Sequence, residues 1–436
     1  MAVSTAFAAQ PLHAQDVAPA APPPAALVSS PVPLAAPAPA DLGVDLFYAA
    51  RNQAPLWLND EAGRAAAAKL APLLRNAALD GLANGPGLAT EVDAAIARGQ
   101  PADDKIISAA WVQYVRTLKG PVAGVSFGDP ALKPVAPTAP AVLSEAARAA
   151  SLATYVDAVA AVNPLYSALR DAAVKQGRTD DPHVRATLQR LRLIPATGRA
   201  VVVDAASAQL WMIEDGKPID SMKVVVGKTT SPTPLLAGTI HYVTFNPYWH
   251  ILDEVALRKV APVVIKRGVS YLKAARYEVV GDWNSESPPV DPKTVDWKGV
   301  AAGTATVHIR QLPGANNMMG AVKFWFENDF GIYLHDTPHK ELFAKPKRNF
   351  SLGCVRLEHA GRLAQWLFGR DASPPGGTPE QHVQLDKGVP VFITYLTANV
   401  ADGQLAFADD VYGLDRPPEA LAATAPPTTG AAAAAH

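Results

Sequence analysis

Residues 200–227, AVVVDAASAQLWMIEDGKPIDSMKVVVG, decide the fold of this 436-residue chain. Apolar and β-branched residues occur here in short runs, and Asp215-Gly216 is typical of a tight hairpin turn. The stretch predicts a strand, a turn, a second strand, a hairpin and a third strand. Further strand-like runs follow at 241–247, 306–310, 322–326, 331–335 and 389–396. We therefore predict that the second half is mostly β, as a sandwich or barrel-like sheet.

Upstream of this stretch the apolar pattern is helical. Ile107, Trp111, Tyr114 and Leu118 recur every three or four residues, and Gly120 ends that run. Asp181-Pro182 supplies an N-cap and a proline at the first helical position of another helix. The predicted helices cover residues 61–82, 102–120, 164–177 and 182–195. The predicted fold class is therefore α+β, with a helical N-terminal region before a mostly β domain.

Composition and periodicity divide the chain into four parts. The ends are rich in alanine and proline, and such segments bury too little apolar surface to fold. Between two β-runs lies a long mixed segment, which we interpret as a lid or binding insertion. The expected parts are a disordered segment 1–42, a helical domain 43–195, a β-rich domain 196–400 with the insertion at about 251–306, and a C-terminal extension with a disordered tail, 401–436.

The N-terminal sequence and the charge bear on location and partners. Residues 1–15, MAVSTAFAAQPLHAQ, are either the remnant of a secretory signal or a disordered alanine-rich end. No run of about 18 apolar residues occurs, so no integral membrane segment is expected. With a net charge of −1 and only short basic runs such as 345–348, no nucleic-acid partner is expected.

The chain contains a single cysteine, Cys354, which can form no internal disulfide and no cysteine-rich metal site. A cysteine attacks as its thiolate and needs a base, and His335 ends a strand-like run 19 residues earlier. Gly353 lets the backbone turn tightly, and the amides of Gly353 and Cys354 could face an oxyanion. Arg356 could hold a substrate carboxylate or orient the loop. The alternative is a buried, inert cysteine.

A metal site is not expected. His335 and His339 have the spacing of ligands on one helical turn, but Pro338 prevents a regular helix there. His339 and the nearby His359 are therefore interpreted as loop histidines. His250 is a weaker candidate for chemistry, because Tyr248 and Trp249 beside it could either line a pocket or fill a core.

Two motifs resemble a known family. HDTP at 335–338 and SLGCVRLE at 351–358 resemble the active-site signature of the L,D-transpeptidases, the YkuD-type cysteine enzymes of bacterial cell walls. Residues 224–251 and 309–338 are similar to further family segments, and the likeness extends over about 199–400. Residues 46–58 and 76–82 resemble, more weakly, the scaffold region of the larger periplasmic members.

The resemblance implies acyl transfer on peptidoglycan stem peptides in the periplasm. Cys354 would attack the carbonyl of a meso-diaminopimelate residue and release D-alanine, and an amine from a second stem would resolve the thioester. His335 would act as general base and then acid. The implied supporting residues are the Asp336 carbonyl to orient His335, the Gly353 and Cys354 amides as oxyanion hole, and Arg356, Ser351, Tyr248, Trp249, Tyr333 and Asn246 as substrate contacts. No cofactor is implied, and carbapenem-type β-lactams would acylate Cys354.

Two departures from the family pattern stand out. Leu352 replaces the histidine that many members have before the glycine, so no second active-site imidazole is expected beside His335. Residues 175–183 join two helices without room for a peptidoglycan-binding module. A hydrolase with the same thioester and a non-catalytic wall-binding protein stay open as alternatives. The third alternative is a papain-like protease, against which stands the order of the two residues, because in that fold the cysteine precedes the histidine. The acceptor and the linkage stay undetermined.

Overall fold

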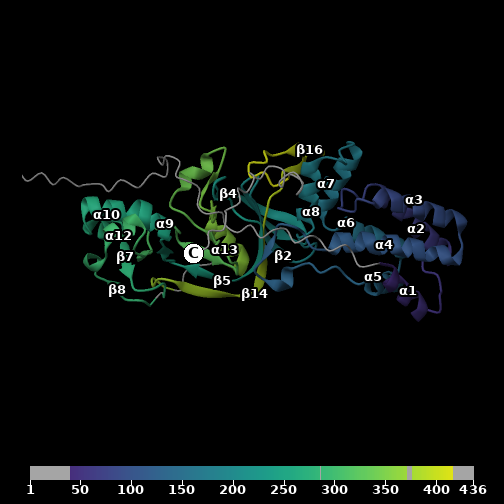
Figure 1. The fold of residues 1–436 in the computed structure, drawn as a ribbon, viewed down its shortest axis with the longest axis horizontal. Helices are drawn as coiled ribbons and strands as arrows, with labels where there is room; N and C mark the ends of the chain where they lie inside the picture. Colours follow the sequence, from purple (N-terminus) through teal and green to yellow (C-terminus); the bar gives the residue numbers. More distant parts are fainter. Residues whose placement is uncertain (1–39, 285, 371–375, 416–436) are drawn as a thin grey trace, which may run out of the picture.

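The computed structural model describes residues 40–284, 286–370 and 376–415. The expected signal remnant, most of the N-terminal disordered segment and the C-terminal tail lie outside these residues. In the described part, every helix is too short or too polar to cross a membrane. Figure 1 shows three regions along the longest axis: helices at one end, a barrel-like sheet in the middle and a small α/β unit at the other end.

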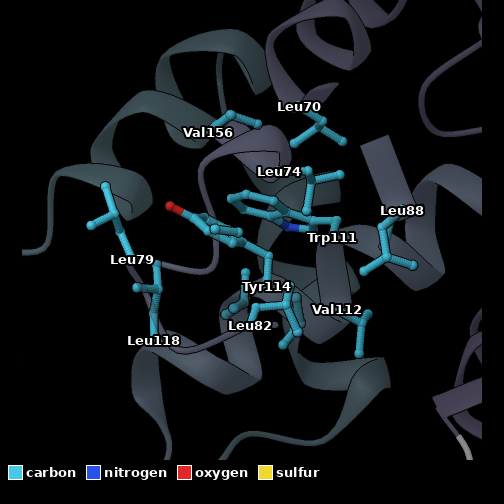
Figure 2. Close-up of a cluster of buried hydrophobic side chains, with 14 of the residues drawn as sticks. Leu70, Leu74, Leu79, Leu82, Leu88, Trp111, Val112, Tyr114, Leu118 and Val156 are labelled. Atoms are coloured by element: carbon cyan, nitrogen blue, oxygen red, sulfur yellow. The ribbon is translucent and has the colours of Figure 1, made fainter. Parts of the chain in front are cut away.

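The N-terminal region is a bundle of helices around a large apolar core. Trp111 and Tyr114 of α4 are fully buried in its centre, with Leu70 and Leu74 of α2 beside them (Figure 2). The helices are α1 (Ala40–Ala50), α2 (Glu61–Arg75), α3 (Gly85–Arg98), α4 (Asp104–Lys119), α5 (Ala139–Arg148), α6 (Leu152–Ala161), α7 (Pro164–Lys175) and α8 (Pro182–Leu191). The apolar spacing seen in the sequence thus does mark the core-facing side of α4.

Helix boundaries agree with the sequence at α8 and disagree at α2. Asp181 accepts hydrogen bonds from the amides of residues 183 and 184, and Pro182 starts α8 as expected. The predicted helix 61–82 was too long, because α2 ends at Arg75. Beyond it the chain turns so that the fully buried Asp80 carboxylate can pair with Arg170 of α7. That tertiary contact overrides the helical propensity of the alanine-rich sequence.

The β domain is a closed barrel. Its strands follow the order β5-β10-β11-β13-β4-β3-β2-β14, and β14 pairs again with β5. Asp215 and Gly216 have φ values of 48° and 73° between β3 and β4, which is the turn geometry that this dipeptide favours. The strands are β2 (Arg199–Asp204), β3 (Gln209–Glu214), β4 (Lys217–Gly227), β5 (Leu236–Phe245), β10 (Val322–Trp325), β11 (Leu334–His335), β13 (Val355–Leu357) and β14 (Gln381–Thr394), with β1 (Ser126–Phe127) beside β5 and β12 (Asn349–Ser351) beside β4.

The continuous apolar run of β2 is explained by burial on both of its faces. Val201 and Val203 point into the barrel core, whereas Ala200 and Val202 pack into the core of the helical region. Side chains alternate along a strand, so one run of four apolar residues serves two cores. The α+β fold class is confirmed, and the barrel wall is also the surface on which the helices dock.

The expected insertion is a folded unit with its own sheet and core. It contains β6 (Trp249–His250), α9 (Asp253–Val255), η3 (Ala256–Val260), α10 (Ala261–Arg267), α11 (Ser270–Ala274), β7 (Tyr277–Val280), β8 (Pro289–Val290), α12 (Trp297–Ala302) and β9 (His308–Gln311). Its first and last strands pair with each other, Trp249 opposite Gln311, so the chain enters and leaves side by side. We call residues 249–311 the cap.

The C-terminal extension returns to the helical region. A hairpin of β15 (Ala398–Ala401) and β16 (Gln404–Phe407) spans the point after residue 400 where we expected a boundary. Beyond it, the buried Asp415 carboxylate lies 2.6 Å from Arg190 Nη1 and 2.7 Å from His183 Nδ1, both of α8. The described end of the chain is therefore ion-paired to the last helix before the barrel.

Arg190→Ala is expected to destabilise the protein by about 3–5 kcal/mol, because it leaves the buried Asp415 carboxylate without its guanidinium partner. Arg185→Ala is the matched control, since Arg185 pairs with Asp180 at the surface and its loss should cost less than about 1 kcal/mol. Urea unfolding of both variants measures the difference. Equal effects of the two substitutions would contradict the assignment of Asp415 as a buried anchor.

Candidate active site

The pairing of β11 with β13 brings the candidate catalytic residues together. The strands are parallel, with Leu334 opposite Val355 and His335 opposite Arg356. Leu334 and Val355 are fully buried in the barrel core. Because side chains alternate, His335 and Arg356 point to the outer face, and so does Cys354 one residue before the strand. The candidate nucleophile, the candidate base and a guanidinium therefore share one surface of the barrel.

Lys323 adds a second cation to this surface. It lies opposite His335 on the antiparallel neighbour β10, while Phe324 beside it faces the core. Its Nζ is 3.7 Å from a Glu380 carboxylate oxygen and 5.4 Å from the centre of the Tyr333 ring. The apolar-polar alternation of residues 322–326 contained this signal, which the sequence analysis did not use.

A cavity of about 280 Å³ lies between this surface and the cap. Of the residues expected from the sequence, it is lined by Cys354, His335, Arg356, Ser351, Tyr248, Trp249 and Tyr333. Residues that the sequence analysis did not propose for the site also line it, among them Lys323, Met318, Met319, Phe330 and Ile332, together with His250, which was only a weak candidate. The cavity thus has walls from the barrel, from the cap and from the loop 326–333.

His335 is held as a neutral imidazole. It is 5% exposed, and its Nδ1 lies 2.6 Å from the backbone carbonyl oxygen of Asp336. Burial and the Arg356 guanidinium lower its pKa to about 3, against a smaller raising effect of the Asp336 bond. A neutral ring donates from Nδ1 to that carbonyl and leaves Nε2 as a proton acceptor. The ring can therefore serve as a base.

Asp336 is fixed from two sides. Its carboxylate accepts hydrogen bonds from Lys340 Nζ at 2.7 Å and from the Ala321 amide at 2.9 Å. The Lys340 ammonium also donates to the Glu358 carbonyl at 2.8 Å, just after β13. These bonds tie the residue that orients His335 to the strand that follows the nucleophile.

Cys354 rests as a thiol. Burial raises its pKa, and this effect exceeds the lowering by the Tyr333 backbone, Arg356 and Lys323. Its Sγ lies 3.7 Å from the Gly331 carbonyl oxygen, to which the S–H group donates. The site therefore contains a neutral thiol and a neutral imidazole, and any attack by the thiol would require proton transfer.

The nucleophile loop departs from the expected oxyanion hole. Gly353 has φ of +126°, and a Cβ there would lie 2.9 Å from Ile332 Cδ1, so the position requires glycine. Its amide donates to Ser351 Oγ at 3.1 Å, so this group is directed at the loop itself and not at a substrate. Ser351, the last residue of β12, is buried and holds the loop that follows it. The Cys354 amide has no hydrogen-bond partner among the described residues and is the remaining donor.

Two other expectations change with the structure. The Asn246 side chain donates to the Gly376 and Thr378 carbonyls at 3.2 and 3.3 Å and does not line the cavity. Asn246 lies just before the cap and has a φ of +49°, a left-handed conformation that asparagine tolerates. Sequence proximity suggested one imidazole at the site, but His250 of the cap also faces the cavity, and burial and Lys323 lower its pKa.

The fold and site thus define a β-barrel that presents a cysteine–histidine pair beneath an inserted cap. Residues 198–393 match the YkuD family model, the L,D-transpeptidase catalytic domain, and residues 43–172 match the scaffold domain model. The chain therefore contains an L,D-transpeptidase catalytic domain of the YkuD family, preceded by an N-terminal scaffold domain. The resemblance noted in the sequence is confirmed.

Individual relatives cover only part of the chain. A Haemophilus influenzae protein, provisionally named an L,D-transpeptidase, is 29% identical over 239 residues, or 52% of this chain and 47% of that protein. The chain thus spans about half the length of this curated relative. Solved relatives include L,D-transpeptidases from Mycobacterium smegmatis (15% identity; 45% of this chain, 59% of that chain; TM-score 0.23) and, as a mutant, Enterococcus faecium (15%; 46%, 51%; 0.23). With such low TM-scores, the family assignment rests on sequence.

Alkylation of Cys354 by iodoacetamide is expected to rise with pH and to reach its midpoint above that of an unperturbed cysteine, because burial raises the thiol pKa. His335 should add no acid limb near 6.5, since its pKa is about 3. Mass spectrometry over a pH series, with N-acetylcysteine as the control, measures both. A plateau of fast alkylation from pH 5 upward would instead indicate a thiolate–imidazolium pair.

Proposed function

We propose that this protein is a peptidoglycan L,D-transpeptidase that acts through a thioester on Cys354 and releases D-alanine in the periplasm. The observation that carries the proposal is the shared outer face of β11 and β13, where Cys354, His335 and Arg356 line one capped cavity. The family match supports the reaction class. No cofactor takes part in the proposed steps.

In the first step the Cys354 sulfur bonds to the carbonyl carbon before the terminal D-alanine, and its proton passes to His335 Nε2. The carbonyl electrons move to oxygen, and the Cys354 amide donates to that oxyanion. Collapse breaks the C–N bond and leaves the thioester. The imidazolium returns its proton to the departing amine, and the low pKa of His335 favours that return.

In the second step an amine of another stem peptide attacks the thioester carbonyl. His335 takes a proton from this amine, a new amide bond forms, and the C–S bond breaks. The thiolate then recovers the proton from the imidazolium. Because each half-reaction uses His335 as a base and then as an acid, one neutral imidazole is sufficient for the cycle.

Arg356 supports recognition of a carboxylate on the donor. Its guanidinium is half-buried in the cavity and forms no salt bridge within 4.0 Å among the described residues, although the Glu341 carboxylate acts on it from farther away. A buried cation without a directly bound counter-ion is costly, and a ligand carboxylate would supply charge-assisted hydrogen bonds. Stem peptides carry such carboxylates, and carbapenems carry one beside their reactive ring.

Cys354→Ala is expected to abolish cross-linking of disaccharide-tetrapeptides without lowering the unfolding temperature, because the variant loses the sulfur but keeps the barrel core. Purified muropeptides, analysed by chromatography and mass spectrometry, measure the products. Dimers made by the native protein support the transferase, shortened monomers identify a hydrolase, and unchanged muropeptides with no carbapenem adduct indicate a wall-binding protein. Dimer formation by the variant would refute Cys354 as nucleophile.

Arg356→Gln is expected to lower kcat/KM for the donor by roughly 10–150-fold, the range for a charge-assisted contact of about 1.5–3 kcal/mol. Donors in which one carboxylate at a time is amidated locate the partner. Amidation of the recognised carboxylate should cost the native enzyme as much as the substitution does and should cost the variant nothing further. Additive losses for every donor would show that Arg356 contacts no donor carboxylate.

A further inference from the structure

The orientation of the Cys354 amide depends on a residue outside the signature motif. The Gly353 carbonyl accepts a hydrogen bond from Thr233 Oγ1 at 2.7 Å. The Gly353 C=O and the Cys354 N–H belong to one planar trans peptide, so they point in opposite directions. A bond that fixes the carbonyl therefore also fixes the direction of the amide that is left to stabilise an oxyanion.

The peptide needs such a bond because the preceding residue is permissive. Gly353 has a φ of +126°, and a glycine can change to other backbone conformations of similar energy. Without a fixed carbonyl, the peptide plane between Gly353 and Cys354 could rotate and turn the N–H away from the cavity. Ser351 Oγ holds the amide on the other side of Gly353, but it does not contact this peptide.

Thr233 is well placed to act as this lock. It is 1% exposed, and its hydroxyl accepts a bond from the Gly227 amide at 2.8 Å while it donates to Gly353. Accepting from one group directs its single proton at the other, and serial bonds of this kind strengthen each other. A Cβ at residue 227 would lie 2.2 Å from the Ser231 carbonyl oxygen, so the close approach requires Gly227.

The C-terminal extension contacts Gly227 through Tyr412. The Tyr412 hydroxyl donates to the Gly227 carbonyl. Its ring stacks on Tyr395 of the barrel, with centroids 5.2 Å apart, and its amide donates to the Tyr395 hydroxyl at 3.0 Å. Three residues later Asp415 is ion-paired to Arg190 of α8. A continuous set of contacts thus joins the end of the helical region to the nucleophile loop.

We propose that Thr233 is the positioning residue of the oxyanion donor, and that Tyr412 of the C-terminal extension holds the Gly227 turn on which Thr233 depends. Neither side chain touches the reacting atoms. Both act by fixing the Gly353–Cys354 peptide, which makes the extension after β14 part of the catalytic apparatus. The inference rests on the proposed role of Cys354 as an acyl-accepting nucleophile.

Two reagents separate the oxyanion donor from the thiol. A carbapenem acylates Cys354: the sulfur bonds to the lactam carbonyl, an oxyanion forms, and the ring C–N bond breaks as nitrogen gains a proton. Iodoacetamide alkylates the same sulfur by displacing iodide and forms no oxyanion. A change confined to the donor slows the first reaction and leaves the second unchanged.

Thr233→Val removes the hydroxyl with little change in volume. We expect its acylation rate constant to fall by at least about tenfold and by at most the roughly 10²–10³-fold known for loss of a whole oxyanion donor. Alkylation should stay at the native rate. Thr233→Ser should recover most of the acylation, and Tyr412→Phe should show a smaller, equally selective loss. Thr239→Val is the matched control, since Thr239 makes a comparable bond to Asp129 away from the loop.

Several outcomes would overturn the inference. Native acylation by Thr233→Val would do so, and so would a parallel fall of acylation and alkylation, which shows an effect on the thiol or the fold. If Thr233→Val unfolds, Tyr412→Phe takes its place and must show the selective loss of acylation, while Thr233→Ser must keep most of the native acylation. Failure of the native protein to react with the carbapenem contradicts the proposed function instead, so the two failures are distinguishable.

Discussion

The site depends on one short parallel ladder, the pairing of the two-residue strand β11 with β13. Leu334 opposite Val355 fills the barrel core, and this requirement places His335 and Cys354 together on the outside. A shift of either strand by one residue would turn its own reactive group into the core. Arg348 stabilises the crossover between the two strands, because its buried guanidinium donates to the carbonyls of Val224, Ser207 and Ala208.

Features of the fold that depend on local sequence could be predicted, and features that depend on contacts between distant elements could not. Local rules were enough to predict the turn at Asp215-Gly216, the N-cap residue of α8 and the core-facing side of α4. The end of α2 was not, because it is set by a buried pair between Asp80 and Arg170 that lie in different elements. Local periodicity contains no information on such a partner.

The site shows the same limit. Cys354 and His335 could be proposed because a lone cysteine and a strand-end histidine carry a chemical signal. Lys323 and His250 reach the cavity only through strand register and through the folding of the cap, neither of which the motif specifies. The Gly353 amide was assigned to the oxyanion hole from its position in the sequence, whereas its direction is set by Ser351 Oγ. The sequence indicates which residues lie near the site, whereas their hydrogen bonds decide which role each of them can have.

The positive charge of Arg356 bears both on the resting protonation states of His335 and Cys354 and on their activation by a bound donor. Arg356 lowers the pKa of His335. It also lowers the pKa of the Cys354 thiol, but burial raises that pKa by more. A donor carboxylate bound to Arg356 would neutralise part of that field. The imidazolium would then be less unfavourable at the moment when His335 accepts the proton from Cys354. Binding of the correct substrate would thus raise the basicity of His335, and in its absence the thiol stays protonated and less reactive. The capped cavity supports this coupling, because exclusion of water strengthens every one of these interactions.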